Sequence, residues 1–297
     1  MSIMKNILIA GGTGLVGRKL AQLLQNNGHK VSILSRNPTN KDEYSWDPKA
    51  ETIDESILAD VEVLINLSGA GIADKKWTNQ RKLELQSSRV GTNIFLYAQV
   101  QKMPKLKHYI CSSGINAYGY KNDKEYSEED PFGVDFLSQL VRVWELSADQ
   151  FKTHCKVAKI RTAMVLDSDG GALKRMVPIV KIGIGSALGS GKQYSPWIHS
   201  YDLAHLFTHV IEKELKGCYN ALAGSVTNKL LMKGIATTLN KPFWFPNVPS
   251  FALRLLYGEM ALMLLNGVRA SNQKILDSGF EFKFKELDEA LTDVLIK

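Results

Sequence analysis

The stretch NILIAGGTGLVGRKL, residues 6–20, constrains the fold of this chain more than any other. An apolar run of strand type breaks at Gly11, Gly14 and Gly17, and the periodic pattern of a helix follows. In such a turn one glycine makes the bend, the next lets a pyrophosphate approach the backbone, and the third lets helix and strand pack closely. A bare structural turn is the alternative. The strand before the glycines and the helix after them favour a dinucleotide-binding turn, in which free N–H groups of the helix start face phosphates.

The first half of the chain alternates strand-like and helical patterns, which is typical of a parallel sheet covered on both faces. Strands are predicted over residues 6–10, 30–35, 61–67, 107–113 and 156–166, and helices over 16–27, 79–100 and 136–151. The predicted fold class is therefore α/β, a Rossmann-like doubly wound parallel sheet. Right-handed crossovers bring the carboxyl ends of its strands to one crevice, where a ligand is expected.

The pattern changes after about residue 167, where glycine-rich sequence and shorter elements begin. We therefore expect a dinucleotide-binding Rossmann domain over 1–167, to which later segments return, and a smaller substrate or lid region over 168–297. The last part of that region, about 248–297, is expected to be helical.

The end of the second strand indicates which dinucleotide is bound. An acidic residue there would accept hydrogen bonds from an unphosphorylated ribose, but this chain has Ser35 and Arg36. A guanidinium is suited to a 2′-phosphate, which a carboxylate would repel. The alternative is a solvated arginine in a loop. The sequence favours NADP(H) as the cofactor.

Small residues also follow the third strand. Ser68 and Gly69 stand where the backbone must pass close to the adenosine and the pyrophosphate. In the next helix Glu84 and Arg89 are spaced so that both can lie near one face, within reach of the cofactor, although exposed helical charges would have the same spacing.

Composition and charge exclude several classes of function. The 297 residues, 44% of them hydrophobic, suffice for a sizeable core. The net charge of +7 comes from dispersed lysines without a basic stripe, so no nucleic-acid partner is expected. The N-terminus lacks the pattern of a secretory signal, which predicts a cytoplasmic protein. Three distant cysteines at no metal or redox spacing are interpreted as buried small residues, so no metal site is predicted.

The longest apolar stretch, residues 248–268, has about the length of a membrane span. Arg254 and Glu259 interrupt it, so no stable membrane insertion is predicted. A buried or groove-lining pair of helices is favoured, with a role at a membrane surface as the lesser alternative.

Together these stretches resemble a known family, the extended short-chain dehydrogenase/reductases, which include nucleotide-sugar epimerases and dehydratases. The closer resemblance is to an atypical branch labelled epimerase family proteins, which end in a domain of unknown function. It rests on GGTGLVG, SRNP, NLSGAGIADKKWT, SSRVGTN, DGGALKRMVP, GSGKQYSPWIHSYD and GVRASNQKILDSGFEFKFKELDEAL, and covers nearly the whole chain.

The resemblance implies a set of cofactor contacts. The turn that would hold the pyrophosphate comprises Gly11, Gly12, Thr13, Gly14, Leu15, Val16 and Gly17. The 2′-phosphate would lie on Ser35 and Arg36. Leu67 and Ser68 would border the adenosine, with Glu84 and Arg89 nearby, and the backbone of Val165 would meet the nicotinamide carboxamide.

The catalytic residues depart from the family pattern. Active members use a tyrosine, a lysine four residues later on the same helix and a serine or threonine to transfer a proton. Matching Glu145 to the helix acid of the family puts Leu137 and Val141 at the tyrosine and lysine positions, and neither can move a proton. Tyr120 and Lys124 have the spacing, but they lie in a polar loop and are interpreted as a coincidence on a solvated segment.

Ser113 is the candidate for the serine, and Tyr118 is a candidate acid on the same rim, with a buried tyrosine that fixes the loop as its alternative. His199 and Asp202 are expected to join the two domains rather than to catalyse a reaction. Lys192, Gln193 and Trp197 are candidate substrate contacts.

Two functions therefore remain open at this point, and the sequence favours the first over the second as its alternative. One is an NADP(H)-dependent oxidoreductase or epimerase-like enzyme that acts on a small-molecule substrate of unknown identity. The other is a protein that binds NADPH without turnover, as a sensor or interaction module. The missing tyrosine and lysine favour the second function, and the serine and the polar lid favour the first. The sequence leaves the oligomeric state undecided.

Overall fold

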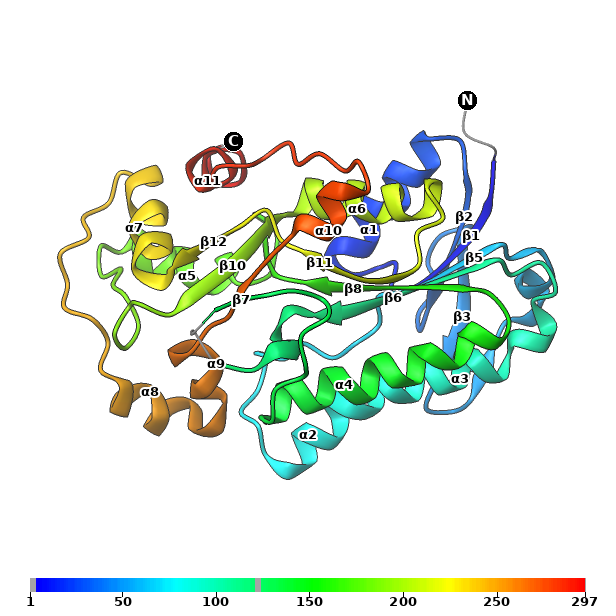
Figure 1. Ribbon diagram of the computed structural model, residues 1–297, viewed down its shortest axis with the longest axis horizontal. Coiled ribbons are helices and arrows are strands. Elements are labelled where there is room, and N and C mark those ends of the chain that lie inside the picture. Colours follow the sequence, from blue (N-terminus) through cyan, green and yellow to red (C-terminus); the bar gives the residue numbers. More distant parts are fainter. Residues whose placement is uncertain (1–3, 121–123, 297) are drawn as a thin grey trace.

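A parallel sheet flanked by helices forms the larger part of the computed structural model, which describes residues 4–120 and 124–296 (Figure 1). The strand order is β11-β8-β6-β5-β1-β2-β3-β4, and only the pairing of β3 with β4 is antiparallel. Its strands are β1 (Asn6–Ala10), β2 (Lys30–Ser35), β3 (Glu43–Asp47), β4 (Thr52–Ile53), β5 (Val63–Asn66), β6 (His108–Gly114), β8 (Lys156–Thr162) and β11 (Gly217–Ala221). The predicted α/β class with a Rossmann-like sheet is confirmed.

Helices cover both faces of this sheet. One face carries α1 (Leu15–Asn26), α6 (Ser200–Glu212) and the short α10 (Gln273–Asp277), and the other carries α2 (Asn79–Gln86), α3 (Thr92–Ala98) and α4 (Phe136–Asp149) (Figure 1). All four residues of β5 are buried, as expected for a strand covered on both sides. The N-terminal half thus buries apolar side chains on both faces of β1 and β5.

The predicted strand over 156–166 is wrong in one respect, because the chain leaves the large sheet at Ala163. Residues up to Thr162 pair with β6 and β11, whereas β9 (Met164–Leu166) pairs with β10 (Tyr194–His199) in a second, three-stranded sheet completed by β12 (Gly224–Thr227). The backbone N–H of Ala163 bonds to the carbonyl of Ala221 at this point. The apolar run over residues 156–166 therefore contributes one strand to each of the two sheets.

The second sheet is the centre of a smaller lobe at the left of Figure 1. Its helices are α5 (Leu173–Lys181), α7 (Asn228–Thr238), α8 (Ser250–Tyr257), α9 (Ala261–Leu265) and α11 (Leu287–Leu295). Leu166, Trp197, Leu231, Phe284 and Leu291 belong to its core. A short parallel pair, β7 (Glu125–Tyr126) with β13 (Arg269–Ala270), links the chain after α9 to the loop after β6.

His199 and Asp202 lie at the junction of the two lobes. The Asp202 carboxylate accepts hydrogen bonds from the backbone N–H groups of Lys283 and Phe284, at 2.8 and 3.0 Å. The His199 ring stacks on Phe284 and, as the N-cap of α6, accepts a hydrogen bond from the backbone of Tyr201 in its first turn. Both side chains thus hold the C-terminal segment to α6, the structural role expected for this pair.

Candidate functional site

The three glycines of the turn between β1 and α1 differ in how much space surrounds each of them. Gly11 has φ of +80°, and a Cβ there would lie 2.9 Å from the backbone of Leu67 and Ser68. At Gly17 a Cβ would lie 2.6 Å from the Cα of Gly12, so that position lets helix and strand pack closely. At Gly14 a Cβ would meet only the Gly11 carbonyl oxygen, at 3.2 Å. The space beside Gly14 is therefore free for a ligand.

The start of α1 suits an anion. Gly14 is the N-cap residue and provides no side-chain hydrogen bond, and the first turn carries no acidic residue. The free N–H groups and the positive end of the helix dipole therefore lack a partner from the helix itself. Gly12, Thr13, Leu15 and Val16 complete the turn as predicted from the sequence. Their assigned contacts with a pyrophosphate stay predictions.

An open groove of about 850 Å³ continues from this turn along the end of β2. The residues that bear on its chemistry are Thr13, Arg18, Ser35, Arg36, Thr39 and Lys41. Arg36 is exposed and has no hydrogen-bond or ion-pair partner among the described residues. Arg18 and Lys41 add two more cations, which the sequence analysis missed because neither belongs to the glycine motif or to the end of the strand.

Two carboxylates, Asp42 and Glu43, also border the groove. Glu43 accepts hydrogen bonds from Asn40 and from the backbone of Thr39, which lower its pKa and fix it as an anion within its own loop. Neither carboxylate replaces Ser35 and Arg36 at the end of β2, which is the position that distinguishes the two forms of the ribose.

The loop after β5 meets the helix that carries Glu84 and Arg89. That helix changes to π-helical geometry over Ser87–Gly91, a feature often found at functional sites. There the Ser88 hydroxyl accepts a hydrogen bond from the Ala70 N–H at 3.0 Å, and the Arg89 guanidinium donates to the Ala70 carbonyl at 2.9 Å. A Cβ at Gly69 would lie 3.1 Å from that guanidinium. The sequence spacing did not predict the π-turn.

Arg89 is 6% exposed and has no carboxylate partner in the described chain. Burial, with a smaller contribution from Arg81, lowers its pKa to about 10. Glu84 instead pairs with Arg81 at 2.6 Å. The Arg89 guanidinium instead donates to the carbonyl groups of Leu85 and Ala70 and lies over the ring of Trp144, so its contact with a cofactor stays a prediction. The Ser68 hydroxyl is also buried and has no hydrogen-bond partner among residues 4–120 and 124–296.

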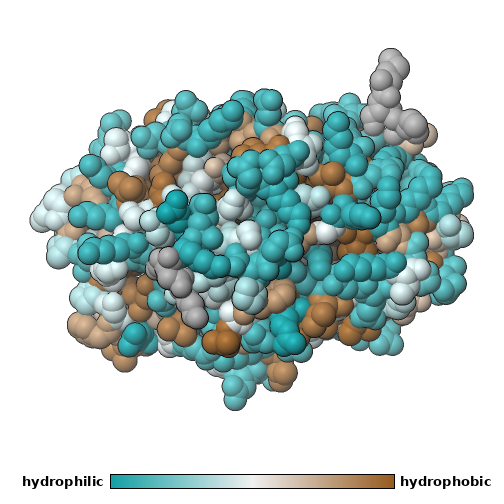
Figure 2. Space-filling view, in the orientation of Figure 1, coloured by the Kyte–Doolittle hydropathy of each residue, from teal (hydrophilic) through white to brown (hydrophobic). Residues whose placement is uncertain are grey.

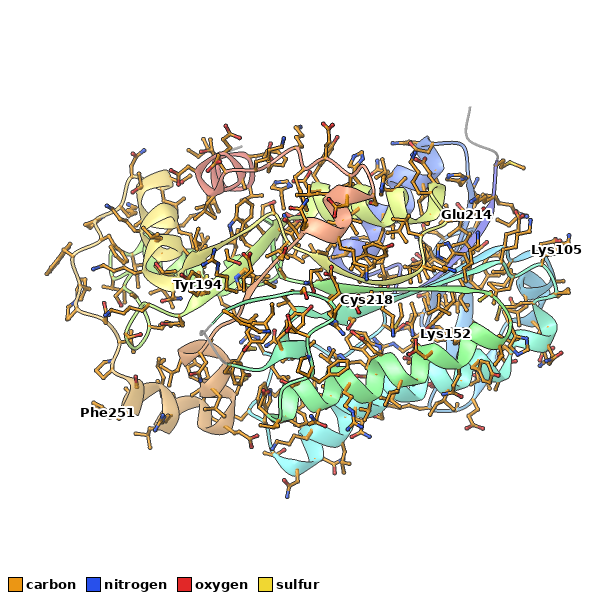
Figure 3. The ribbon with its side chains drawn as sticks, in the orientation of Figure 1. Lys105, Lys152, Tyr194, Glu214, Cys218 and Phe251 are labelled. Atoms are coloured by element: carbon orange, nitrogen blue, oxygen red, sulfur yellow. The ribbon has the colours of Figure 1, made fainter. Side chains whose placement is uncertain are left out.

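The candidate catalytic serine lies in a buried ionic network. Ser113 is 4% exposed and donates a hydrogen bond of 2.7 Å to Glu145. Glu145 accepts two more from the guanidinium of Arg161, at 2.8 and 3.0 Å. Cys218 of β11 lies beside the same carboxylate, with its Sγ 3.8 Å away (Figure 3). The serine hydroxyl is thus engaged by the protein.

Tyr118 belongs to the same network. Its hydroxyl donates to Asn220 at 2.6 Å and accepts from Arg161 at 2.9 Å, and the side chain is 2% exposed. Burial raises the pKa of Tyr118 well above its ordinary value, so the phenol stays protonated. These contacts match the alternative of a buried tyrosine that fixes the loop.

The positions matched to the family tyrosine and lysine are apolar and buried. Leu137 and Val141 are 1% and 4% exposed, and a Cβ at Gly114 would lie 3.4 Å from the Val141 side chain. Lys124 forms an ion pair with Asp130 and lies over the ring of Tyr126, so it does not serve Tyr120.

The expectation that Tyr120 lies on a solvated loop is wrong. Its side chain is half-buried, and its hydroxyl is buried beside the side chain of Asn116. Burial and the nearby carboxylate of Asp135 raise the pKa of the Tyr120 phenol. The polar sequence around Tyr120 concealed this burial, because it depends on elements distant in the chain.

Of the candidate substrate contacts, only Lys192 is exposed. Gln193 is buried and donates to the carbonyl groups of Leu188 and Leu264, at 3.0 and 2.8 Å, so it joins the glycine-rich loop to α9. Trp197 is 1% exposed and packs in the core of the smaller lobe. Packing therefore accounts for both of these side chains. Val165 lies in β9, opposite Ile198 of β10.

No group of three or more histidine, cysteine or carboxylate side chains in residues 4–120 and 124–296 could hold a metal ion. Over the same ranges no helix is long and apolar enough to cross a membrane.

Comparisons with known proteins identify the family. Residues 7–136 match the NAD dependent epimerase/dehydratase family, and residues 248–294 match a domain of unknown function, DUF1731. The mouse epimerase family protein SDR39U1 is 33% identical over 97% of this chain and 99% of its own length. The chain belongs to the epimerase family. A second member, ML0860 of Mycobacterium leprae, is 33% identical over 96% of this chain and 94% of its own.

A solved structure supports the same assignment. The human epimerase family protein SDR39U1, crystallised with NADPH, aligns with a TM-score of 0.88 at 31% identity, over 97% of this chain and 98% of that one. A nucleoside-diphosphate sugar epimerase from Corynebacterium glutamicum aligns with a TM-score of 0.81 at 25% identity, over 99% of this chain and 58% of that one. The NADPH of the human family member agrees with the cofactor predicted from Ser35 and Arg36.

Proposed function

We propose that this chain binds NADPH along the carboxyl ends of β1, β2 and β5. The observation that carries the proposal is the groove at the end of β2, which is lined by Gly12 and Thr13 of the glycine turn and by Ser35 and the unpaired Arg36. The pyrophosphate would lie on the N-terminus of α1, and the 2′-phosphate would lie at Arg36, with Arg18 and Lys41 near it. The human relative crystallised with NADPH supports this assignment.

Replacing Arg36 by Asp tests the cofactor preference. We expect the affinity for NADPH to fall by about 2 kcal/mol, roughly 30-fold, because a charge-assisted pair is lost and a repulsion is added. The affinity for NADH should change little, since its ribose has no 2′-phosphate. Isothermal calorimetry with both dinucleotides measures the two affinities.

The matched control for this test is Arg142→Asp, which changes an exposed arginine of α4 outside the groove. It should leave both affinities unchanged. Equal weakening of NADPH and NADH by Arg36→Asp, or an equal loss in the control, would contradict the assignment of Arg36.

We further propose that binding, and not the proton transfer of the family, is the function that the described crevice supports best. Leu137 and Val141 replace the tyrosine and the lysine, and the hydroxyl groups of Ser113 and Tyr118 bond to Glu145 and Asn220. A proton donor must reach the reacting atom through a free hydrogen bond. This favours an NADPH-binding sensor or interaction module.

One observation favours a second candidate, an NADPH-dependent reductase. The Tyr120 hydroxyl is a buried donor with no hydrogen-bond partner in the described chain other than the side chain of Asn116. NADPH supplies a hydride when bound, and the proton for a carbonyl oxygen would come from this phenol, which water would then reprotonate. The pKa of Tyr120 is raised, so the phenol retains its proton before the reaction.

NADPH absorbance followed over a panel of aldehydes and quinones distinguishes the two candidates. If Tyr120 is the donor, Tyr120→Phe should lower turnover about 100-fold, whereas Tyr118→Phe should change it much less. No turnover by the unmodified protein with any acceptor would favour the binding module. A loss confined to Tyr118→Phe or Ser113→Ala would contradict the choice of Tyr120.

A further inference from the structure

The smaller lobe has an unusual distribution of charge. Residues 170–201 and 224–258 contain eight lysines and arginines and no aspartate or glutamate. These two segments form α5, β10, β12, α7 and α8. Their charge exceeds the net +7 of the whole chain, so the rest of the protein is close to neutral. A positive field over one end of a molecule attracts anionic surfaces.

Nearby carboxylates neutralise only part of this charge. Asp74 is paired with Arg175 at 3.1 Å, and Asp288 of α11 lies beside Gly234 of α7, whereas Glu259 is paired at 2.5 Å with Lys82, which lies outside the two segments. The acidic residues of α11 lie on the other side of α7 from α8 (Figure 1). The cations at the outer edge of the lobe, among them Lys181, Lys241 and Arg254, are exposed and have no ion pair in the described chain.

Large apolar side chains are exposed at the same edge. Leu255 is 81% exposed, Phe251 74%, and Trp244 and Ile182 71% each. Figure 2 shows hydrophobic surface at the lower left, where α8 lies in Figure 1, and Figure 3 draws Phe251 at the outer edge of the lobe. We call these four residues, with Lys181, Lys241 and Arg254, the α8 face. Phe251 and Leu255 lie four residues apart, on the same side of α8. Single exposed apolar residues are common, but several in one lobe indicate an interaction site.

The α8 face is held in place by the rest of the lobe. A Cβ at Gly183 would lie 3.8 Å from the ring of Pro242, which places the end of α5 beside the loop that carries Trp244. The same loop is joined to the glycine-rich segment by a bridge between Leu188 and Val248 and by a hydrogen bond from Asn247 to Gly189. The exposed side chains therefore project from an ordered edge.

We propose that the α8 face docks onto the surface of an anionic lipid bilayer. Tryptophan, phenylalanine and leucine side chains that project from an outer edge can enter the boundary between headgroups and acyl chains together. The surrounding cations would bind anionic headgroups, each adding to the attraction. A nucleic acid would match the charge but not the aliphatic side chains Ile182 and Leu255, which cannot stack on bases as aromatic rings do.

Vesicle sedimentation of the full-length protein tests this proposal. Vesicles of phosphatidylcholine with about 30% phosphatidylglycerol should bind the protein, and vesicles of phosphatidylcholine alone should bind it much more weakly. The double variant Phe251→Ser/Leu255→Ser should lower binding about tenfold or more. The double variant Lys241→Gln/Arg254→Gln should do the same, at about fivefold for each lost charge.

Each double variant has a matched control. Ile94→Ser/Leu146→Ser removes two exposed apolar side chains of α3 and α4, and Lys105→Gln/Lys152→Gln removes two exposed cations toward the other end of the molecule (Figure 3). Both controls should bind vesicles as the unmodified protein does. All variants should keep the unmodified affinity for NADPH, which shows that they are folded.

Absence of binding to anionic vesicles would overturn the proposal, and so would an equal loss in the controls. Analytical ultracentrifugation tests whether the α8 face binds a second copy of this chain instead of a lipid surface. A dimer that Phe251→Ser/Leu255→Ser dissociates, in a protein that does not bind vesicles, would make the α8 face an interface between two copies of this chain and would also overturn the lipid proposal.

Discussion

Replacing Gly14 by Val should abolish NADPH binding while the protein stays folded. A Cβ at this position would meet only the Gly11 carbonyl oxygen, and φ is −75°, so the backbone tolerates a side chain. The branched side chain would instead occupy the space where we place the pyrophosphate. Calorimetry should detect an affinity at least about 100-fold weaker, a loss of nearly 3 kcal/mol or more. The Gly14→Val protein should keep the circular dichroism spectrum of the unmodified protein.

Gly17→Val is the control that separates ligand space from packing space. A Cβ at Gly17 would lie 2.6 Å from the Cα of Gly12, which is backbone and cannot rotate away. We therefore expect this variant to lose stability by several kcal/mol. Undiminished NADPH affinity in a folded Gly14→Val protein would contradict the phosphate-binding turn.

The second large effect concerns the buried network of Ser113, Glu145 and Arg161. Glu145→Ala should lower the free energy of unfolding by about 3–5 kcal/mol, because it leaves the buried guanidinium of Arg161 without its carboxylate. Ser113 would lose its acceptor in the same change. Urea denaturation followed by circular dichroism measures the difference.

The matched variant is Glu214→Ala, which removes a glutamate that pairs with Lys5 and Lys156 at the surface (Figure 3). Its side chain is 47% exposed, so the loss should stay below about 1 kcal/mol. Similar stability losses in the two variants would show that the Glu145 network does not have the structural role assigned to it here.

The sequence predicted those elements whose signals all lie within one short stretch of the chain. The strand–glycine turn–helix unit of residues 6–26 was predictable, since apolar period, turn chemistry and helix start agree along one stretch. The division of residues 156–166 between two sheets was not predictable from the sequence. An unbroken apolar run is compatible with one strand or two, and the choice depends on β10 and β11, which come later in the chain.

The candidate site also contains some residues that the sequence predicted and others that only the structure brings together. Ser35 and Arg36 follow from their place at the end of a strand, whereas Arg18 and Lys41 join them only through the spatial arrangement of α1 and the loop before β3. The hydroxyl of Ser113 could not be assigned from spacing, because its partner Glu145 lies 32 residues away on α4. Sequence patterns give residue types at strand ends, but burial and hydrogen-bond partners depend on tertiary packing.

We propose that this chain binds NADPH and recognises its 2′-phosphate. Calorimetric titration of the unmodified protein with NADPH and with NADH, in the same buffer, measures this recognition. The groove with Arg36, Arg18 and Lys41 predicts that NADPH binds at least about tenfold more tightly than NADH. Equal affinity for the two dinucleotides, or no binding of either, would contradict it.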